Sequence, residues 1–328
     1  MASNVMPAEW APQAWLWIGF PHLEDEWPGY LAAAQEQIAA FANAVAASGQ
    51  EVRLLVRDDA NAARARELVS DTVTLEQRVY GDIWLRDTGP LVRCDGSALR
   101  CRFNGWGGKY VMAGDEAIGA ELARDADLPV VASDWVLEGG AIDSDGTGTI
   151  LTTEQCLLNP NRNPALARED IEARLAHDLG ASRIIWLGDG LVNDHTDGHV
   201  DNLARFVAPG EVALPEAAGA DDPNAAIYAD AKARLLKAGL TVHAVPSPGL
   251  ITRAGQIEPA SYVNFAITMH SVIVPTFGSP HDANGVAAIA ALFPDCEVIG
   301  LPADAVLAGG GGFHCASQHM PDLTAAGS

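Results

Sequence analysis

The stretch "EDEWPGYLAAAQEQIAAFANAVAASGQEVRLLVR", residues 24–57, contains the pattern that decides the fold class. Apolar residues recur at helical spacing over residues 24–50, and a short run of strand-forming residues follows over residues 51–57. The same pairing recurs at residues 58–71 with 72–79, 168–182 with 183–188, 222–240 with 241–246 and 281–295 with 296–301. Five such helix–strand units predict an α/β protein.

Additional strands are expected between these units. Strand-like runs lie at residues 98–106, 148–153, 199–207 and 261–277. A doubly wound nucleotide-binding sheet is the alternative, but no G-x-G-x-x-G opens a helix and no G-K-[ST] follows a glycine run, so we set it aside. Because no Pro- or Ser-rich linker divides the chain, we predict a single domain over residues 1–328.

Composition restricts the partners and the location of the protein. The 328 residues are 48% hydrophobic, which suffices for a large core. The formal net charge of −23 argues against nucleic acid as a partner; it favours cationic ligands or serves solubility, and the charge alone does not decide between these two. The apolar run at residues 14–20 is too short to span a membrane or act as a secretion signal. Five cysteines without such a signal predict reduced thiols and a cytoplasmic location.

The segment "NDHTDGHVDN", residues 193–202, has a ligand-capable side chain at every second position. In an extended segment, His195, Asp197, His199 and Asp201 would project from one face. Four such groups on one face require a cation, which is either a metal or the substrate. A zinc site built from His195, His199 and Asp201 is the metal interpretation, although the usual short zinc spacings are absent.

Two further motifs place polar groups at the ends of apolar runs. In "GDIWLRDTGPLV", residues 81–92, Trp84, Arg86 and Asp87 lie in a strand-like run, where a surface ion pair between Arg86 and Asp87 is the simpler interpretation. In "WVLEGGAIDSDGTG", residues 135–148, Glu138 precedes two glycines. A turn at a strand end is the simpler interpretation of Glu138, because glycine pairs are common there.

A glycine loop near the C-terminus presents a cysteine. In "LAGGGGFHCASQHMP", residues 307–321, four glycines precede His314 and Cys315. A buried structural thiol and an accessible reactive thiol are equally consistent with this motif. Structural roles are expected for the other cysteines, Cys94, Cys101, Cys156 and Cys296, of which the first two flank the turn of a predicted hairpin.

Taken together, these motifs favour a cationic substrate over a metal. Carboxylates beside a thiol oppose thiolate formation and are unsuited to a cysteine protease, but they can clamp a planar guanidinium through charge-assisted hydrogen bonds. Attack by the thiolate on the guanidinium carbon, with a histidine that protonates the departing ammonia and later activates water, converts a guanidine into a urea. This chemistry requires neither a metal nor an organic cofactor.

Four motifs in one order resemble the agmatine deiminase family of the guanidine-modifying (pentein) superfamily. They are "WLRDTGP" (84–90), "EGGAIDSDGTGTILTTEQCLLNPNRNP" (138–164), "NDHTDGHVDN" (193–202) and "GGGGFHCASQHMP" (309–321). The resemblance implies a five-bladed α/β propeller with pseudo-fivefold symmetry. It also implies hydrolysis of agmatine to N-carbamoylputrescine, a step of polyamine biosynthesis, through a covalent cysteine-linked amidino intermediate.

The resemblance also implies roles for five residues of the reacting centre. Cys315 would be the nucleophile and His199 the general acid and base. The carboxylates of Asp87 and Asp201 would clamp the guanidinium nitrogens. Glu138 would bond the substrate and orient His199.

Other positions are predicted to bind or surround the substrate. Asp197 would assist in orienting the catalytic histidine, and Trp84 would line the passage for the methylene chain. Asp194 is the candidate partner of the distal ammonium of agmatine. The segment "LLNPNRNP", residues 157–164, is expected to be a structural loop that precedes a helix.

The sequence departs from the family pattern where the distal end of the substrate is expected. "GFPHLEDEW" (19–27) replaces a Trp-Pro-x-Arg segment, His195 and Asp197 replace Glu and Asn, and "GGFHC" (311–315) replaces Gly-Asn-Ile-His-Cys. Another guanidine or peptidyl-arginine is therefore the alternative substrate. A cation-binding protein without turnover is a third interpretation. Family members are commonly homo-oligomers, and the sequence leaves the oligomeric state open.

Overall fold

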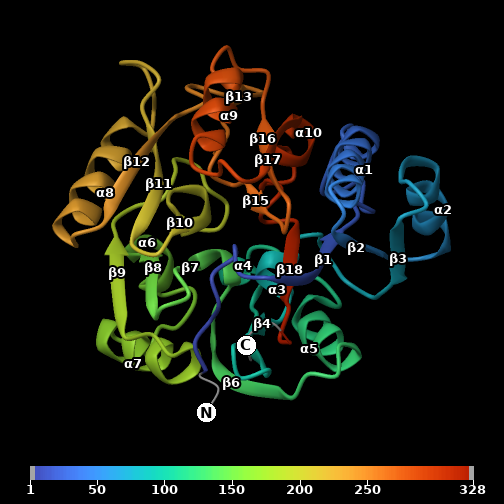
Figure 1. Cartoon of the computed structure of the whole chain (residues 1–328), viewed down its shortest axis with the longest axis horizontal. Helices are drawn as coiled ribbons and strands as arrows, with labels where there is room; N and C mark the ends of the chain where they lie inside the picture. Colours follow the sequence, from blue (N-terminus) through green and yellow to red (C-terminus); the bar gives the residue numbers. More distant parts are fainter. Residues whose placement is uncertain (1–3, 325–328) are drawn as a thin grey trace.

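The computed structural model of the chain describes residues 4–324 and arranges them around five small sheets (Figure 1). In each of the five, an antiparallel strand pair is followed by a parallel strand, and a helix makes the parallel crossover. Two consecutive strands that run parallel need such a crossover, because a tight turn reverses the chain and makes the next strand antiparallel. The shared strand arrangement explains the recurring helix–strand pattern of the sequence.

The first two sheets use the N-terminal half and the last strand of the chain. The first has the order β18 (Ser317–Pro321), β1 (Gln13–Gly19), β2 (Glu51–Val56) and β3 (Val73–Gln77), with crossovers α1 (Leu31–Ala47) and α2 (Asp59–Leu68). The second has β4 (Leu91–Val92), β5 (Ala98–Arg102) and β6 (Val130–Val136), with α4 (Gly105–Gly108) and α5 (Asp115–Asp125).

The remaining three sheets follow in chain order. The third has β7 (Ile142–Ser144), β8 (Thr149–Thr153) and β9 (Arg183–Leu187), with α6 (Glu154–Leu157) and α7 (Arg168–Leu179). The fourth has β10 (Arg205–Ala208), β11 (Glu211–Glu216) and β12 (Thr241–Pro246), with α8 (Ala225–Lys237). The fifth has β15 (Ala266–Ile267), β16 (Ser271–Thr276) and β17 (Glu297–Pro302), with α9 (Asp282–Ala290). A small hairpin, β13 (Thr252–Arg253) and β14 (Gln256–Ile257), precedes the fifth sheet.

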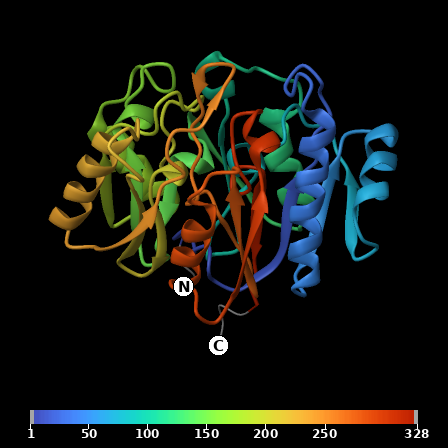
Figure 2. The same ribbon diagram turned by 90° about the horizontal axis from the view of Figure 1, so that it is seen from above.

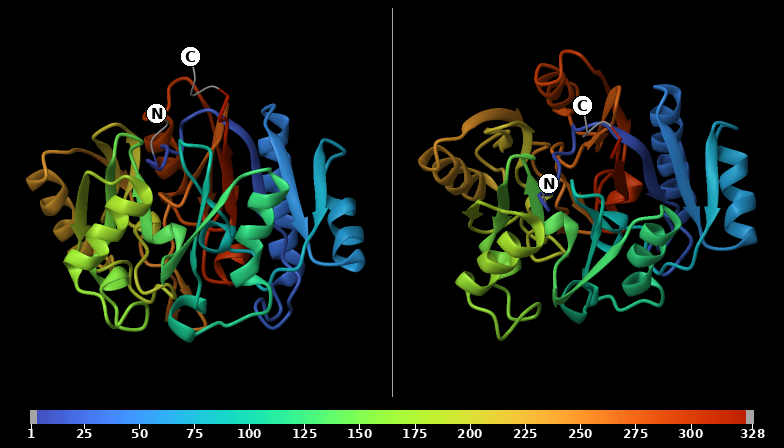
Figure 3. Two further views of the ribbon diagram at one scale, coloured as in Figure 1. Left: turned by 90° about the horizontal axis from the view of Figure 1, so that it is seen from below. Right: turned by 60° about the horizontal axis from the view of Figure 1, so that its bottom comes forward.

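The long helices lie at the periphery of the molecule. Figure 1 shows α1, α2, α5, α7, α8 and α9 outside the sheets, and Figures 2 and 3 show α2 and α8 at opposite ends of the molecule. Short connecting elements, including α3 (Leu85–Thr88), η1 (Gly139–Ala141), η2 (Val200–Asn202) and α10 (Asp304–Leu307), join the sheets. No helix within residues 4–324 is long and apolar enough to cross a bilayer.

All five predicted helix–strand units are present, but their count was misleading. Two of them, α1–β2 and α2–β3, belong to the same sheet. A sixth unit, α5–β6, was missed; most side chains of β6 are exposed or half-buried, so it lacks a clear apolar run. The agreement between five units and five sheets is therefore coincidental.

Packing of α1 fixes the loop that contains the predicted nucleophile. Ile38, Phe41 and Val45 form the buried stripe of this helix, at the i, i+3, i+7 spacing of one helix face. The ring of Phe41 stacks on Phe313, with the centroids 4.7 Å apart. Burial of two aromatic rings stabilises the contact by roughly 3 kcal/mol or more. The segment just before Cys315 is thus anchored in the core.

Candidate active site

Each of the five connections from one sheet to the next contributes to one buried cluster. The contributing residues are Asp87 on α3, Glu138 before η1, His199 and Asp201 at η2, Asn264 before β15, and Cys315 before β18. The structure therefore brings together all five side chains predicted for the reacting centre and adds Asn264. The predicted surface pair is wrong, because Arg86 and Asp87 are both buried, on a one-turn helix rather than a strand.

Hydrogen bonds hold both the backbone and the side chain of Cys315. Its carbonyl accepts a hydrogen bond from the backbone N–H of Arg86 (3.0 Å), and Asn264 Nδ2 donates to Cys315 Sγ (3.1 Å). Asp201 Oδ2 lies 3.5 Å from the same sulfur. The thiol is buried beside a carboxylate, so its surroundings are those of a ligand site rather than of an apolar core.

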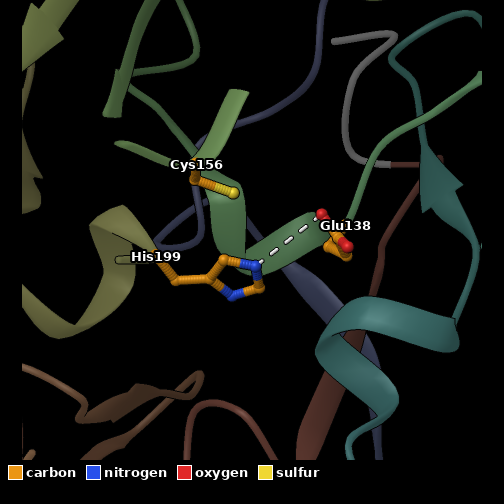
Figure 4. A group of neighbouring side chains, drawn as sticks. All are labelled: Glu138, Cys156 and His199. Atoms are coloured by element: carbon orange, nitrogen blue, oxygen red, sulfur yellow. Dashed lines mark ion pairs between the residues drawn. The ribbon is translucent and has the colours of Figure 1, made fainter. Parts of the chain in front are cut away.

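His199 lies between two carboxylates and a second thiol. Its Nδ1 is 3.6 Å from Asp87 Oδ1 and its Nε2 is 3.8 Å from Glu138 Oε2. Figure 4 shows the imidazole ring close to both Glu138 and Cys156, with a dashed line from the ring to Glu138. Both ring nitrogens and Glu138 Oε2 lack a hydrogen-bond partner although they are fully buried. Unpaired buried polar atoms are costly, so their concentration here indicates a place for a polar ligand.

Glu138 is oriented by Arg162, which the sequence interpretation missed. Arg162 Nε donates to Glu138 Oε1 (2.7 Å), and both side chains are fully buried. The other end of the guanidinium pairs with Asp197. The predicted structural loop at residues 157–164 therefore also delivers a charge to the site.

Asp87 is fixed by two hydrogen bonds that leave it facing the cluster. The indole N–H of Trp106 donates to Asp87 Oδ2, and the backbone N–H of Gly140 donates to Asp87 Oδ1, both at 2.8 Å. A Cβ atom on Gly140 would lie 2.6 Å from His199 Nδ1 and 2.9 Å from Asp87 Oδ1. Only glycine fits at this position. A Cβ on Gly139 would overlap the carbonyl oxygen of Arg86, so both glycines after Glu138 are required.

A series of buried hydrogen bonds and ion pairs holds the carboxylate of Asp201 in place. His314 lies between Asp201 Oδ2 and Glu9 Oε2, at 2.8 Å from each, and Glu9 also pairs with Arg205. Asp201 Oδ1 has no partner. Burial raises the pKa of Asp201, but the hydrogen bond and charge of His314, together with the charge of His199, outweigh it and lower that pKa. Asp201 is thus an ionised carboxylate with a free oxygen.

The pKa values of the thiol and the imidazole are shifted in the same direction. Burial, followed by the charges of Asp201 and Asp87, raises the pKa of Cys315 well above its ordinary value. Burial acts to lower the pKa of His199, but Asp87, Cys156 and Glu138 outweigh it and raise that pKa well above its ordinary value. The protein alone therefore favours a neutral thiol beside a protonated imidazole.

A cavity of about 230 Å³ leads from the surface to Cys315. The lining includes Trp84, Asp87, Trp106 and Thr196 together with Gly309 to Gly311, of which Gly311 lies beside the thiol. The aromatic walls and glycine backbone make a passage suited to a thin apolar chain. Trp84 thus lies where a lining residue was predicted.

The segment 193–202 is not extended, contrary to prediction. It forms turns that end in η2, and Asn193 and Asp197 have left-handed φ angles of 61° and 64°. The period-two geometry is therefore lost, since turns do not place alternate side chains on one face. His199 and Asp201 reach the buried cluster, whereas His195 lies exposed at the cavity mouth.

Two aspartates of that segment have other partners than those predicted. Asp194 Oδ1 accepts hydrogen bonds from Thr196 N and Oγ1, and its Oδ2 accepts one from Asn202. Asp194 therefore fixes the turn and does not line the cavity. Asp197 pairs with Lys109 and Arg162. It does not contact the imidazole of His199 directly.

The predicted zinc ligands His195, His199 and Asp201 do not gather at one point. Within residues 4–324, the one group of three ligand-type side chains is Glu138, Cys156 and His199, whose ligand atoms lie within 4.8 Å of one another. The guanidinium of Arg162 already pairs with Glu138 in that group. A cation beside the carboxylate opposes a divalent metal at the same place.

Comparisons with known proteins agree with this geometry. A family model described as Porphyromonas-type peptidyl-arginine deiminase matches residues 5–321. An agmatine deiminase of Stutzerimonas stutzeri is 39% identical, with 96% of this chain and 95% of that protein covered. For an agmatine deiminase of Pseudomonas putida the identity is 37% with the same coverage. A solved structure of Enterococcus faecalis agmatine deiminase has a TM-score of 0.91 at 32% identity, with 97% of this chain and 95% of that chain covered, so the two share one mixed α/β fold. On a match of this extent, the chain belongs to the Porphyromonas-type peptidyl-arginine deiminase family.

Proposed function

We propose that the protein hydrolyses the guanidinium group of agmatine to give N-carbamoylputrescine and ammonia. The observation that supports this most directly is the buried thiol of Cys315, which lines one cavity together with Asp87 and has the carboxylate of Asp201 3.5 Å from its sulfur. Agmatine deiminases among the relatives indicate the substrate. Neither a metal nor a cofactor enters the proposed reaction.

The guanidinium would bind with its plane against the carboxylates of Asp87 and Asp201. Asp201 Oδ1 and Glu138 Oε2 have no hydrogen-bond partner in the protein. The N–H groups of the bound guanidinium would donate hydrogen bonds to these two oxygens. Paired carboxylates hold a planar guanidinium in one orientation through charge-assisted hydrogen bonds. This orientation would place the guanidinium carbon over Cys315 Sγ.

In the first half of the reaction, the bound guanidinium lowers the pKa of Cys315, and the thiol proton passes to solvent. The resulting thiolate attacks the guanidinium carbon and forms a C–S bond. The protonated imidazole of His199 gives its proton to one departing nitrogen, and the C–N bond breaks to release ammonia. The carbon then carries the alkylamino group, one nitrogen and the sulfur of Cys315, as a covalent amidino intermediate. His199 is left neutral.

In the second half, a water molecule takes the place of ammonia. Neutral His199 removes a proton from the water, whose oxygen adds to the same carbon. The C–S bond breaks, the urea product is released, and the thiol of Cys315 recovers a proton. Glu138 would keep the imidazole oriented in both halves, because it lies beside Nε2 and is itself fixed by Arg162.

A first prediction concerns the charge state of Cys315. Because its pKa is raised by burial and by two carboxylates, we expect no thiolate at neutral pH in the free protein. A bound guanidinium offsets the carboxylates and lowers this pKa, so the thiolate should form with ligand. Ultraviolet absorbance titration of the wild type against Cys315→Ser, with and without a non-reactive guanidinium compound, measures the difference. Full ionisation at pH 7 without ligand would contradict substrate-dependent activation.

A second prediction concerns Gly140. Gly140→Ala should lower kcat/KM for agmatine by about 100-fold, because the added Cβ displaces His199 and Asp87 by a fraction of an ångström to an ångström. Steady-state kinetics measures the loss, and circular dichroism checks that the fold is retained. Gly219→Ala, in a loop that does not line the cavity, is the matched control and should behave as wild type. Wild-type kinetics of Gly140→Ala would show that the close approach is unimportant.

The architecture around the site is proposed as well. We infer that the five sheets form a five-bladed propeller around the buried cluster, since each connection between sheets supplies part of it. Residues 4–324 would then act as a single catalytic domain. All five cysteines are free, in keeping with the expected cytoplasmic location. Association into homo-oligomers stays a prediction, as does the lack of nucleic-acid and membrane partners.

The proposed function is tested by ammonia release from three guanidines. Agmatine, arginine and a blocked peptidyl-arginine are each offered to the purified protein, and the urea product is identified. Turnover of agmatine with little turnover of the other two supports the proposal. Preferential turnover of peptidyl-arginine would retain the chemistry and replace the substrate, and lack of turnover of all three would reject the proposal.

A further inference from the structure

The outer part of the cavity is lined by three carboxylates that the reaction itself does not use. Asp82, Glu26 and Asp25 line the same cavity as Cys315 and Asp87. Their burial decreases along the passage, because Asp82 is buried, Glu26 is half-buried and Asp25 is exposed. The cavity is thus acidic at its mouth as well as at its inner end.

The negative charge at the mouth is not balanced by ion pairs. Within residues 4–324, the structure shows no hydrogen bond or ion pair for the carboxylates of Glu26 and Asp25. Burial, and then the charge of Asp25, raises the pKa of Glu26. Burial also raises the pKa of Asp82, and the charges of Glu26 and Asp115 add to this effect. A bound cation would stabilise the ionised forms of Glu26 and Asp82, because it offsets the neighbouring negative charges that raise their pKa values.

Trp84 connects the thiol with this acidic group. A Cβ on Gly311 would lie 2.7 Å from Trp84 Cζ3 and 3.0 Å from Cys315 Cβ, so one edge of the indole lies beside the nucleophile. The Trp84 side chain lines the same cavity as Asp82 and acts to lower the pKa of that carboxyl, against the larger effect of burial. One indole therefore separates the reacting centre from the acidic mouth.

The side chains directly behind the cavity lining show independently that a ligand belongs there. His199 lies beside Asp87 and Asp201 lies beside Cys315, and both ring nitrogens of His199 and Asp201 Oδ1 are buried without partners. A ligand that satisfies them and extends along Trp84 would place its far end near Glu26. A short alkyl chain that carries positive charge at both ends fits this distribution of carboxylates.

We propose that Glu26, assisted by Asp82 and Asp25, binds the distal ammonium of the substrate and selects guanidines with a cationic tail. The assignment rests on the proposed deimination and replaces Asp194, whose carboxylate bonds the turn instead. A guanidine with a carboxylate tail meets like charge at the mouth and binds poorly. A neutral tail gains neither attraction nor repulsion.

Three guanidines of matched length test this subsite: agmatine, butylguanidine and 4-guanidinobutanoate. For the wild type, we expect kcat/KM to fall in that order. Glu26→Gln should lower the agmatine-to-butylguanidine ratio of kcat/KM by about fivefold to tenfold, as expected when one half-buried ion pair is lost. Glu26→Lys should lower the ratio further and improve 4-guanidinobutanoate. Glu169→Gln, the same change at an exposed position on α7, should leave the ratio at the wild-type value.

Equal turnover of agmatine and butylguanidine by the wild type would overturn the subsite, as would an unchanged ratio in both Glu26 variants. Failure of the proposed function differs, since no guanidine would then be turned over. In that case, calorimetric titration of Cys315→Ser with agmatine and butylguanidine, with and without Glu26→Gln, still decides the question. Loss of the binding difference in the double variant supports the subsite, and a retained difference rejects it.

Discussion

Replacing Cys315 by serine is expected to lower kcat for agmatine by at least about 1,000-fold while leaving the fold intact. A serine hydroxyl is a far weaker nucleophile than a thiolate, and the nearby carboxylates of Asp201 and Asp87 oppose its ionisation as they oppose that of the thiol. The two side chains have nearly the same shape, so the hydrogen bond from Asn264 should persist. Ammonia release, binding of agmatine and thermal unfolding would be measured together.

The matched control for this change is Cys296→Ser. Cys296 is another free thiol whose pKa is raised by burial, but it lies just before β17 and does not line the cavity. We expect its variant to keep kcat within about twofold of wild type, since only local packing changes. Turnover by Cys315→Ser within tenfold of wild type would rule out Cys315 as the nucleophile.

Replacing His199 by asparagine is expected to lower kcat by about 100-fold to 10,000-fold, the usual contribution of general acid–base catalysis. The imidazole is the group that lies between Asp87 and Glu138, and its raised pKa keeps it protonated for the departure of ammonia. Its removal also takes one positive charge from between two carboxylates. Affinity for the guanidinium should therefore be unchanged or higher while kcat falls.

Separate measurement of binding and turnover distinguishes this role from a structural one. Calorimetry would give the affinity of His199→Asn for agmatine, and single-turnover kinetics would give the rate of ammonia release. His243→Asn, a change in a histidine that pairs with Glu211 on the fourth sheet, is the control and should match wild type. Weaker binding by His199→Asn with an unchanged rate for the bound substrate would contradict the assigned role.

The sequence predicted those helices and strands whose residue pattern is complete within one continuous segment. The stripe of apolar residues in α1 and the strand-forming run of β2 were both predicted, since each lies within one continuous segment. The strand β6 was missed because its side chains are mostly exposed, which removes the apolar run. The one-turn helix α3 was missed because four residues are too few to show helical periodicity.

The sequence predicted those site residues that lie in short motifs rich in reactive side chains. Cys315, His199 and Asp201 lie in motifs dense with reactive groups. Arg162 lies among Asn and Pro residues that are typical of a loop, and its partner Glu138 is 24 positions away in the chain. Glu9 acts on His314 across 305 positions. No local pattern indicates such contacts, because the arrangement of the sheets creates them.

The acidic mouth illustrates the same limit. Residues 24–26 were expected to belong to a helical unit, but α1 begins only at Leu31, and the preceding turns bring Glu26 to the cavity. Asp82 reaches the same place from the segment before α3. Their juxtaposition comes from two different connections and is visible only in three dimensions.

Acid quenching of the protein during turnover of agmatine, followed by mass analysis of the intact chain and its peptides, tests whether Cys315 forms the covalent intermediate. We expect an adduct with the mass of agmatine less ammonia, located on Cys315 and more abundant in His199→Asn if loss of the base slows hydrolysis more than formation. An adduct on Cys156, or active protein without any adduct at Cys315 even in rapidly quenched samples, would contradict it.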